Sequence, residues 1–367
     1  MMNFITYIIR IIVGVLFIFS GLIKANDPSG LSYKMQEFFE VWNMTFFNDY
    51  TLVFSILMIA FEIIAGVAVL LGWQFKLFSW LLFLLIVFFT FLTGYAVLSG
   101  KIRECGCFGD CIKLTANQSF YKDLILFAMI GFLLIKRNTI KPLFAQSISV
   151  VLLSITTIAS FGAQIHVLQH LPLVDCLPYK VGKDIQEGMK APLGSIPDST
   201  VINFVYLRDG KEVEFDAEHF PNDFNDSLYS FVRRYDKLIR EGNAKPPIKD
   251  FVINTPDGID TTQAILLDPR EMMVLFVKEM SEYRSWVDDF KAVVTIMQQN
   301  GRPIIVITAD YENVKNAFDE NSIILPIYKG DAVAIKTAAR STPTLYRIQQ
   351  GVILQKWGRL DLKEAIN

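Results

Sequence analysis

The sequence is poor in cysteine and has no excess of basic charge. Its 367 residues include four cysteines, too few for a disulfide scaffold, so they indicate either local thiol chemistry or a local cross-link. The formal net charge is −2, and no basic patch or tail is present, so we predict no nucleic-acid partner. Internal repeats and low-complexity segments are also absent from the sequence. These absences leave the apolar residues as the main source of information.

What the chain does contain is an excess of apolar residues in its first half. Hydrophobic residues make up 52% of the chain, with 30 phenylalanines, and the excess lies almost entirely before about residue 167. The second half carries mixed charges and turns marked by proline and glycine. We therefore expect a membrane half, for which the lipid bilayer is a necessary partner, joined to a soluble half.

Five apolar runs are long enough to cross a bilayer core of roughly 30 Å as helices, the form that satisfies backbone groups in lipid. They cover residues 4–23, 52–72, 77–98, 120–135 and 143–165. We interpret the first as a retained span, because it is too long for a signal peptide, Arg10 interrupts it and no small-residue cleavage site follows. The aromatic-rich loop 24–49 predicts a further helix, which lies in the membrane interface.

The loop between the fourth and fifth spans indicates how the chain is oriented. Lys136, Arg137 and Lys141 make this short loop strongly basic, which places it in the cytoplasm. The longer loops on the other face also contain basic residues, but at lower density and mixed with acids. We therefore predict a multi-pass membrane protein whose C-terminal half lies outside the cytoplasm.

Three of the four cysteines form a cluster between the third and fourth spans. Cys105, Cys107 and Cys111 lie within an eight-residue stretch, and Cys176 follows the fifth span on the same predicted face. Two glycines in the cluster let the backbone fold back, so that the sulfurs can approach one another. Outside the cytoplasm these cysteines can stay oxidised.

Three interpretations of the cysteines stay open. In the first, Cys105 with Cys107, or Cys107 with Cys111, forms a reactive redox pair, and Cys176 acts as a relay or resolving thiol. In the second, the four cysteines form two structural disulfides that tie the loop to the start of the soluble half. A metal site is the least favoured, because the cluster lacks the paired Cys-x-x-Cys motifs of zinc ribbons.

Charged residues inside the spans predict a polar site within the membrane. Arg10 and Glu62 lie at nearly the same depth if each helical residue rises about 1.5 Å. An unpaired charge in lipid costs at least ~2.5 kcal/mol, so we predict that the two form an ion pair. The pair is either a structural pin between two helices or part of a pocket for a quinone head or a proton path. Lys122 and Asp123 would extend such a pocket toward the cysteines.

The second half shows strands and helices in alternation. A hairpin is expected over 201–206 and 211–215, followed by a helix over about 226–241. The remaining expected elements are strands at 251–253, 272–277, 303–308 and 323–327, helices at 284–299 and 311–321, and a final hairpin over 345–348 and 352–357. This order predicts an α/β domain.

A first family resemblance covers residues 1–140. It rests on Arg10, Glu62, the string from Phe19 to Lys24 and, most specifically, Cys105-Gly106-Cys107-Phe108-Gly109. These features resemble the DoxX and MauE families, which are four-helix inner-membrane proteins, some linked to disulfide formation or quinone-coupled thiol oxidation. The resemblance implies a membrane α-helical bundle with a four-helix core, then a fifth helix and linker over 141–178. It also implies a quinone as the candidate cofactor and a location in the bacterial inner membrane, with the C-terminal domain in the periplasm.

A second resemblance covers about residues 245–365. It rests on the strings 246–251 (PPIKDF) and 256–258 (PDG), the strand 274–277, and Thr342-Pro343-Thr344. These resemble thioredoxin-like domains of the TlpA and peroxiredoxin type, and the likeness implies that Pro343 is cis. Where that family has Cys-x-x-Cys, residues 281–284 read Ser-Glu-Tyr-Arg, so the C-terminal α/β thioredoxin-like domain is degenerate and contains no thiol.

The resemblances suggest a domain order and a partner. An extracytoplasmic hairpin-plus-helix segment is expected over 179–244, followed by the degenerate thioredoxin-like domain over 245–367. We predict that the face at Thr342 and Pro343 binds an extracytoplasmic protein partner by strand addition. The layout also resembles that of bacterial vitamin K epoxide reductase homologues, although their cysteines are spaced differently.

Two functions follow from the sequence. The first is an envelope protein that couples thiol–disulfide exchange in the Cys105–Cys111 loop to a membrane quinone. The alternative is a non-enzymatic interaction or assembly subunit of an envelope complex, with structural disulfides and a partner-binding thioredoxin-like domain. The cysteine cluster favours the first, whereas the missing Cys-x-x-Cys favours the second.

Overall fold

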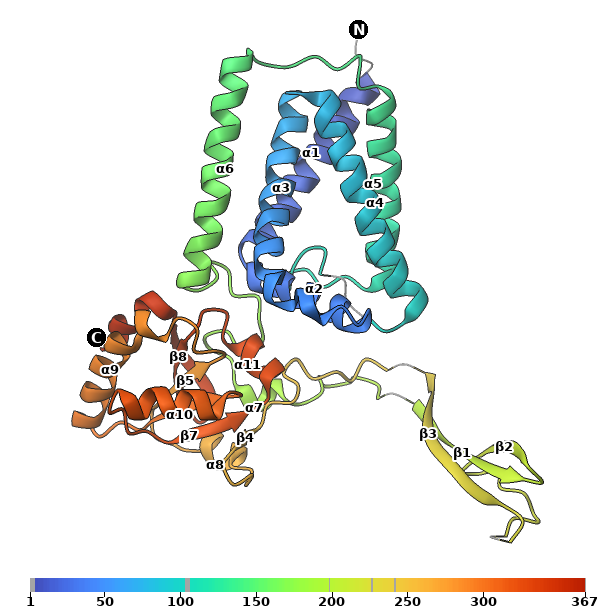
Figure 1. Cartoon of the computed structure of the whole chain (residues 1–367), viewed down its shortest axis with the longest axis vertical. Helices are drawn as coiled ribbons and strands as arrows, with labels where there is room; N and C mark the ends of the chain where they lie inside the picture. The colour runs from blue at the N-terminus through green and yellow to red at the C-terminus, as the bar shows by residue number, and fades with distance from the viewer. Residues whose placement is uncertain (1–3, 103–105, 198, 226, 241, 367) are drawn as a thin grey trace.

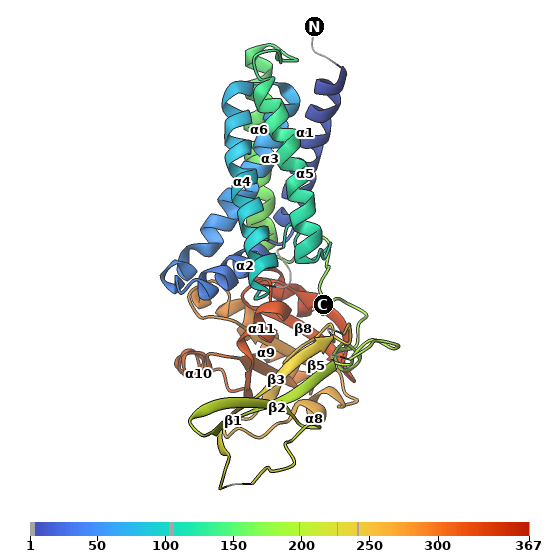
Figure 2. The same cartoon turned by 90° about the vertical axis from the view of Figure 1, so that its right-hand side faces the viewer.

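The computed structural model describes residues 4–102, 106–197, 199–225, 227–240 and 242–366. A helical membrane half lies against a mixed α/β domain (Figures 1 and 2), and a small sheet extends away from both (Figure 1). Cys105 lies outside the described residues, so its predicted pairing stays a prediction. Cys107, Cys111 and Cys176 are all described.

The predicted membrane spans are confirmed. Among the described residues, five helices are long and apolar enough to cross a bilayer: α1 (Phe4–Ala25), α3 (Thr51–Leu71), α4 (Phe75–Ser99), α5 (Ala116–Ile135) and α6 (Gln146–Gln169). The predicted helix between the first two spans is α2 (Pro28–Val41), followed by the 3-10 turn η1 (Thr45–Tyr50). Helix α6 packs beside α3, apart from α4 and α5 (Figure 1). The chain is therefore a multi-pass membrane protein.

Helices α1 and α3 pack closely because glycines face each other across their contact. A Cβ atom built on Gly66 would lie 2.9 Å from the carbonyl oxygen of Gly14 and 3.0 Å from the backbone nitrogen of Ile18. Small residues of this kind let membrane helices approach at backbone distance. The contact sets the register of the two antiparallel helices, so that Gly21 packs against Ile63 and Glu62.

The C-terminal half is a mixed α/β domain, as predicted. Its six-stranded sheet has the order β4-β7-β6-β5-β8-β9, in which β5, β6 and β7 are parallel and the other pairs antiparallel. The strands are β4 (Ile253–Asn254), β5 (Met272–Val277), β6 (Ile304–Thr308), β7 (Ile327–Gly330), β8 (Thr344–Gln349) and β9 (Val352–Trp357). All six residues of β5 are buried, which is why this strand is a continuous apolar run.

Helices cover both faces of this sheet. They are α7 (Ile185–Gly188), α8 (Thr262–Leu266), η2 (Tyr283–Ser285), α9 (Val287–Gln299), α10 (Tyr311–Glu320), α11 (Ala332–Ala338) and η3 (Arg359–Ile366). Tyr179 and Ile185, which precede the small sheet in sequence, are buried in the same core as Phe276 and Tyr346. The strand expected at 323–327 begins only at Ile327, and α8 and α11 were not expected.

The small sheet corrects one prediction. The hairpin is confirmed as β1 (Ser199–Arg208) and β2 (Lys211–Asp216), but the helix expected over 226–241 is wrong. Residues Ser230–Arg240 form a third strand, β3, antiparallel to β1. Val205 pairs with Arg233 and Tyr206 with Phe231, so a bulge shifts the alternation there. The apolar residues of β3 are therefore spaced as in an amphipathic helix, although this segment is a strand.

The glycine contact between α1 and α3 gives the first test. We expect Gly66→Ala to destabilise the protein by about 1–3 kcal/mol, because the added methyl group forces two backbones apart. The matched control is Gly162→Ala in α6, where no atom lies within 4 Å of the new Cβ. That change should be neutral or stabilise by about 1 kcal/mol through helix propensity. Unfolding of both purified variants in detergent measures the difference, and equal effects would contradict this packing.

Candidate functional site

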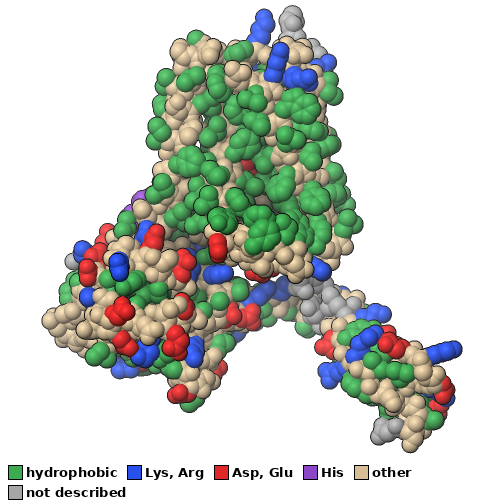
Figure 3. All heavy atoms as spheres, in the orientation of Figure 1, with side chains coloured by type: hydrophobic (Ala, Val, Ile, Leu, Met, Phe, Trp, Pro, Cys, Tyr) green, Lys and Arg blue, Asp and Glu red, His purple; other side chains and the backbone are tan. Residues whose placement is uncertain are grey.

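The membrane half encloses a cavity of ≈500 Å³ between α1, α2, α3, α4, α5 and the loop that carries Cys107. Apolar and aromatic side chains form most of its wall, among them Phe17, Phe38, Trp42, Phe61, Phe89 and Leu126. In the space-filling view, acidic atoms are visible through a gap in the apolar surface of the bundle (Figure 3). The size and composition of the cavity suit an apolar organic ligand with a few polar atoms.

A buried ion pair lines one side of this cavity. The ammonium of Lys24, at the end of α1, lies 2.5 Å from a carboxylate oxygen of Glu62 on α3, and both side chains are almost fully buried. The hydroxyl of Ser20 donates to the other carboxylate oxygen at 3.1 Å. The Lys24 ammonium also lies over the ring of Phe89. Each charge therefore has its partners within the protein, as a low-dielectric site requires.

A second charged pair comes from α5. The Lys122 ammonium lies 2.6 Å from one carboxylate oxygen of Asp123, and the hydroxyl of Thr93 on α4 donates to the other at 3.0 Å. Asp123 is completely buried, and the Lys122 ammonium lies over the ring of Phe108 in the cysteine loop. Both residues, predicted as pocket candidates, line the same cavity as Glu62.

The predicted pairing of Arg10 with Glu62 is wrong. Arg10 instead donates to the carbonyl oxygens of Val69, at 2.8 Å, and Leu70, at the C-terminal end of α3. Carbonyls in the last turn of a helix lack the usual donors four residues later, so the guanidinium supplies donors to them. The Val69 carbonyl also accepts from the backbone nitrogen of Gly72 at 3.1 Å. The register set by the glycine contact places Lys24, not Arg10, opposite Glu62. The depth of a residue within its own span could not reveal this register.

Cys107 carries a free thiol on the wall of the cavity. Its carbonyl oxygen lies 3.1 Å from the Ser20 hydroxyl, whose single proton is shared between this carbonyl and Glu62, and the contact ties the cysteine loop to α1. The preceding Gly106 has φ +67°, a conformation that glycine adopts without strain. Burial raises the pKa of the Cys107 thiol, and the positive charge of Lys122 opposes this effect. Burial therefore disfavours the thiolate of Cys107, while the nearby Lys122 cation favours it.

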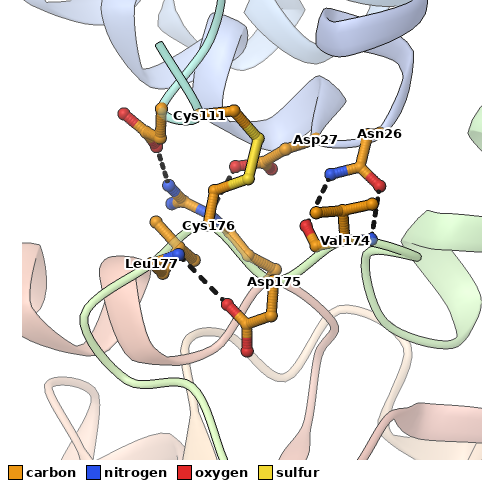
Figure 4. The surroundings of a disulfide bond; sticks show 9 residues. Asn26, Asp27, Cys111, Val174, Asp175, Cys176 and Leu177 are labelled. Atoms are coloured by element: carbon orange, nitrogen blue, oxygen red, sulfur yellow. Dashed lines mark hydrogen bonds and ion pairs between the residues drawn. A yellow bond between two sulfur atoms is a disulfide. The ribbon is translucent and has the colours of Figure 1, made fainter. Parts of the chain in front are cut away.

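The structure contains one disulfide among the described residues, between Cys111 and Cys176. It joins the cysteine loop to the segment that follows α6, beside hydrogen bonds that Asn26 exchanges with the backbone of Val174 (Figure 4). The predicted pair of Cys107 with Cys111 is therefore not formed. The bond agrees with the structural interpretation for Cys111 and Cys176 and leaves Cys107 available.

The Thr342–Pro343 peptide bond is cis, as the resemblance implied. Its surroundings differ from the prediction, because this loop lies against the membrane half of the same chain. Pro343 is buried, and the Ser341 hydroxyl donates to the carbonyl oxygen of Gln169 at the end of α6. The face predicted to bind a separate protein is thus occupied, at least beside Ser341, by the chain itself.

Several functional residues were missed at the level of sequence. Lys24 was recognised only as the last residue of the string from Phe19 to Lys24, although a lysine at the end of an apolar span suggests a buried partner. Asp27, Asp110 and Arg340, which join the two halves, gave no signal, because they are far apart in the chain. Other contacts across the same boundary are Lys278 with Tyr33, Lys336 with Gln36 and His170 with Asp361.

Comparison with known proteins supports the family resemblance of the membrane half. Residues 2–136 match the family described as methylamine utilisation protein MauE, and residues 200–241 match a domain of unknown function (DUF8463). The chain is 29% identical over 147 residues to Protein TlpB of Flavobacterium psychrophilum. The aligned region covers 37% of this chain and 39% of that protein. No solved structure matches at a significant level. The MauE resemblance of the membrane region is thereby confirmed.

The buried ion pair gives the second test. We expect Lys24→Met to destabilise the protein by about 3–5 kcal/mol, because Glu62 is left charged without a partner. Combining it with Glu62→Leu should restore much of that loss, whereas combining Arg10→Leu with Glu62→Leu should be additive. Unfolding in detergent measures both double-mutant cycles. Coupling in the Arg10 cycle and none in the Lys24 cycle would contradict the observed pairing.

Proposed function

We propose that the protein is a membrane thiol–disulfide oxidoreductase in which the Cys107 thiol exchanges electrons with a lipid-soluble quinone. The observation that carries the proposal is the free Cys107 thiol on the wall of an apolar cavity that holds two buried ion pairs. The gap seen in Figure 3 supports entry of the ligand from the bilayer. The MauE match of residues 2–136 supports this reading of the membrane region.

The lining of the cavity fits a quinone. A quinone ring is planar and apolar apart from two carbonyl oxygens, and the cavity combines aromatic walls with two ammonium groups, Lys24 and Lys122. These ammonium groups would donate hydrogen bonds to the carbonyl oxygens, while the aromatic side chains would contact the ring faces. The carboxylates of Glu62 and Asp123 offer proton-accepting oxygens in the same space.

The chemistry balances as a two-electron exchange. Joining two thiols as a disulfide releases two electrons and two protons, which a bound quinone accepts as it becomes a quinol. Cys107 supplies one sulfur, and the second belongs to Cys105, two residues earlier, or to a thiol of a partner protein. The Lys122 charge favours the Cys107 thiolate, the form that attacks a disulfide. Burial opposes ionisation, which limits unwanted oxidation of the thiol.

The proposal includes an orientation and a fold for the α/β domain. The Cys111–Cys176 disulfide supports an oxidising, extracytoplasmic location for this side of the membrane, and the basic loop at Lys136 supports a cytoplasmic location for the other. The strand order, with three parallel strands and a closing antiparallel hairpin, supports a thioredoxin-like domain. The sequence after Cys176 has no cysteine, so in this proposal the α/β domain takes no part in the thiol chemistry itself.

A second candidate is an assembly subunit of an envelope complex. The observation that favours it is the projecting sheet β1–β3, which exposes apolar side chains such as Phe231 and Ile239. In that case Cys107 would have no redox role. The two functions therefore differ in whether loss of the Cys107 thiol changes electron transfer.

Cys107→Ser tests the proposed activity. Purified protein, reduced at both Cys105 and Cys107 and freed of reductant, is mixed with a short-tailed benzoquinone, and quinol formation is followed by absorbance. We expect the Cys107→Ser variant to fall to the rate without protein, because the attacking sulfur is gone. The control is Thr156→Ala, since this exposed hydroxyl bonds only its own helix. Equal rates for Cys107→Ser and the native chain would favour the assembly role.

Labelling of intact cells tests the orientation. After mild reduction of the cell surface, a membrane-impermeant maleimide should modify Cys111 and Cys176 without permeabilisation, because both lie on the extracytoplasmic side. The modified residues are identified by mass spectrometry, and a known extracytoplasmic disulfide protein controls for reduction. If these cysteines are labelled only in permeabilised cells while the control is labelled in intact cells, the chain has the inverse topology.

A further inference from the structure

Arg340 of the α/β domain reaches into the membrane half. Its side chain is only 6% exposed, and its guanidinium lies over the ring of Tyr33 on α2. The Nε atom lies 2.8 Å from a carboxylate oxygen of Asp27, and a terminal nitrogen donates to Asp110 at 2.6 Å. One cation from the α/β domain thus bridges two carboxylates of the membrane half.

Asp110 belongs to the same short loop as Cys107, which we call the thiol loop (residues 106–111). The helical bundle contacts the first part of this loop, because the Ser20 hydroxyl bonds the Cys107 carbonyl and the Phe108 ring lies against Phe19 and under the Lys122 ammonium. The last two residues of the loop are attached to residues that follow α6, Asp110 to Arg340 and Cys111 to Cys176. The position of the thiol loop therefore also depends on how the α/β domain is docked.

We propose that Arg340 is a positioning residue for the thiol site, through which the α/β domain holds the Cys107 thiol against the cavity. That this role matters for activity rests on the proposed thiol chemistry. The effect of Arg340 on the position of Cys107 can be measured without any redox reaction. The role explains why a domain without cysteines is joined to the membrane half. It acts as the fixed support of the thiol loop.

Electrostatics shows which group would move if Arg340 were lost. Asp27 is the N-cap of α2, where it accepts a hydrogen bond from the backbone nitrogen of Gly30 at 3.0 Å. Burial raises the pKa of Asp27, the charge of Arg340 lowers it, and the negative charge of Asp110 raises it again. Without Arg340, the pKa of Asp27 would rise further and Asp110 would lose its ion pair. Asp27 is held by its helix, so Asp110 would move away and take the thiol loop with it.

The chain offers a matched control at the same boundary. Lys336, on α11, donates to the side chain of Gln36 on α2 at 3.2 Å and, like Arg340, lies over the ring of Tyr33. Among the described residues, its ammonium makes no hydrogen bond or ion pair with the thiol loop. Replacing Lys336 by glutamine removes one positive charge between the domains, as replacing Arg340 does. A difference between the two variants therefore reports on the thiol loop and not on weakened docking in general.

The experiment follows alkylation of Cys107 by a maleimide in the full-length protein, with Cys105→Ser as the common background and the disulfide kept oxidised. Mass spectrometry gives the rate for the Cys107 peptide. We expect Arg340→Gln to react about tenfold faster, corresponding to ~1.4 kcal/mol of loop opening, and Lys336→Gln within about twofold of the background. Arg340→Lys should fall between them, because an ammonium cannot bridge two carboxylates in the fork geometry of a guanidinium.

The pH dependence of the same reaction separates positioning from a general loss of stability. In the background protein, the rate should keep rising at pH values where an exposed cysteine has levelled off, since burial disfavours the thiolate. In Arg340→Gln, the pH at which the alkylation rate reaches half its maximum should move down toward the value for an exposed cysteine. Unchanged rate and midpoint in Arg340→Gln, or an equal change in Lys336→Gln, would overturn the proposal.

A second variant keeps the proposal testable if Arg340→Gln does not accumulate. Asp110→Asn frees the thiol loop while Arg340 stays paired with Asp27, so it should also speed alkylation of Cys107. Failure of the native protein to reduce a quinone would refute the proposed activity and leave these rates unaffected. Unchanged rates in a protein that does reduce a quinone would refute only the positioning role of Arg340.

Discussion

The constraint on which the structure depends is that charges inside a bilayer must find partners within the protein. Lys24 with Glu62 and Lys122 with Asp123 meet this constraint by pairing around one cavity, and Arg10 meets it at the far end of α3. The glycine contact between α1 and α3 brings the first pair into register. As a result, the polar groups of the bundle gather at the end where the thiol loop and the α/β domain meet it.

The α/β domain is therefore more than an appended module. The Cys111–Cys176 disulfide and the Arg340 guanidinium connect it to the loop that carries the free thiol, and Asn26 adds backbone hydrogen bonds beside them. The cavity supplies an apolar space and paired charges, while the domain supports the loop from the aqueous side. In this account the cysteines have different roles, with Cys107 reactive and Cys111 and Cys176 structural.

How much the sequence could predict varied with the physical signal. The spans and the buried strand β5 were predictable, because length and continuous hydrophobicity are local properties of the chain. The partner of Glu62 was not, since it depends on a helix register that close glycine packing sets. Strand β3 was mistaken for a helix because a bulge disturbs its alternation. The bond between Cys111 and Cys176 spans 65 residues, and the bridging role of Arg340 appears only once the domains are docked.

The division of roles among the cysteines is the central claim, and a direct map of their oxidation state tests it. Protein isolated from its membranes after acid trapping of thiols is alkylated and examined by mass spectrometry, with and without prior exposure to a quinone. We predict that Cys111 and Cys176 are joined in nearly all molecules under both conditions, whereas Cys107 changes between free thiol and disulfide. A main species in which Cys107 is bonded to Cys111 or Cys176 would contradict the account.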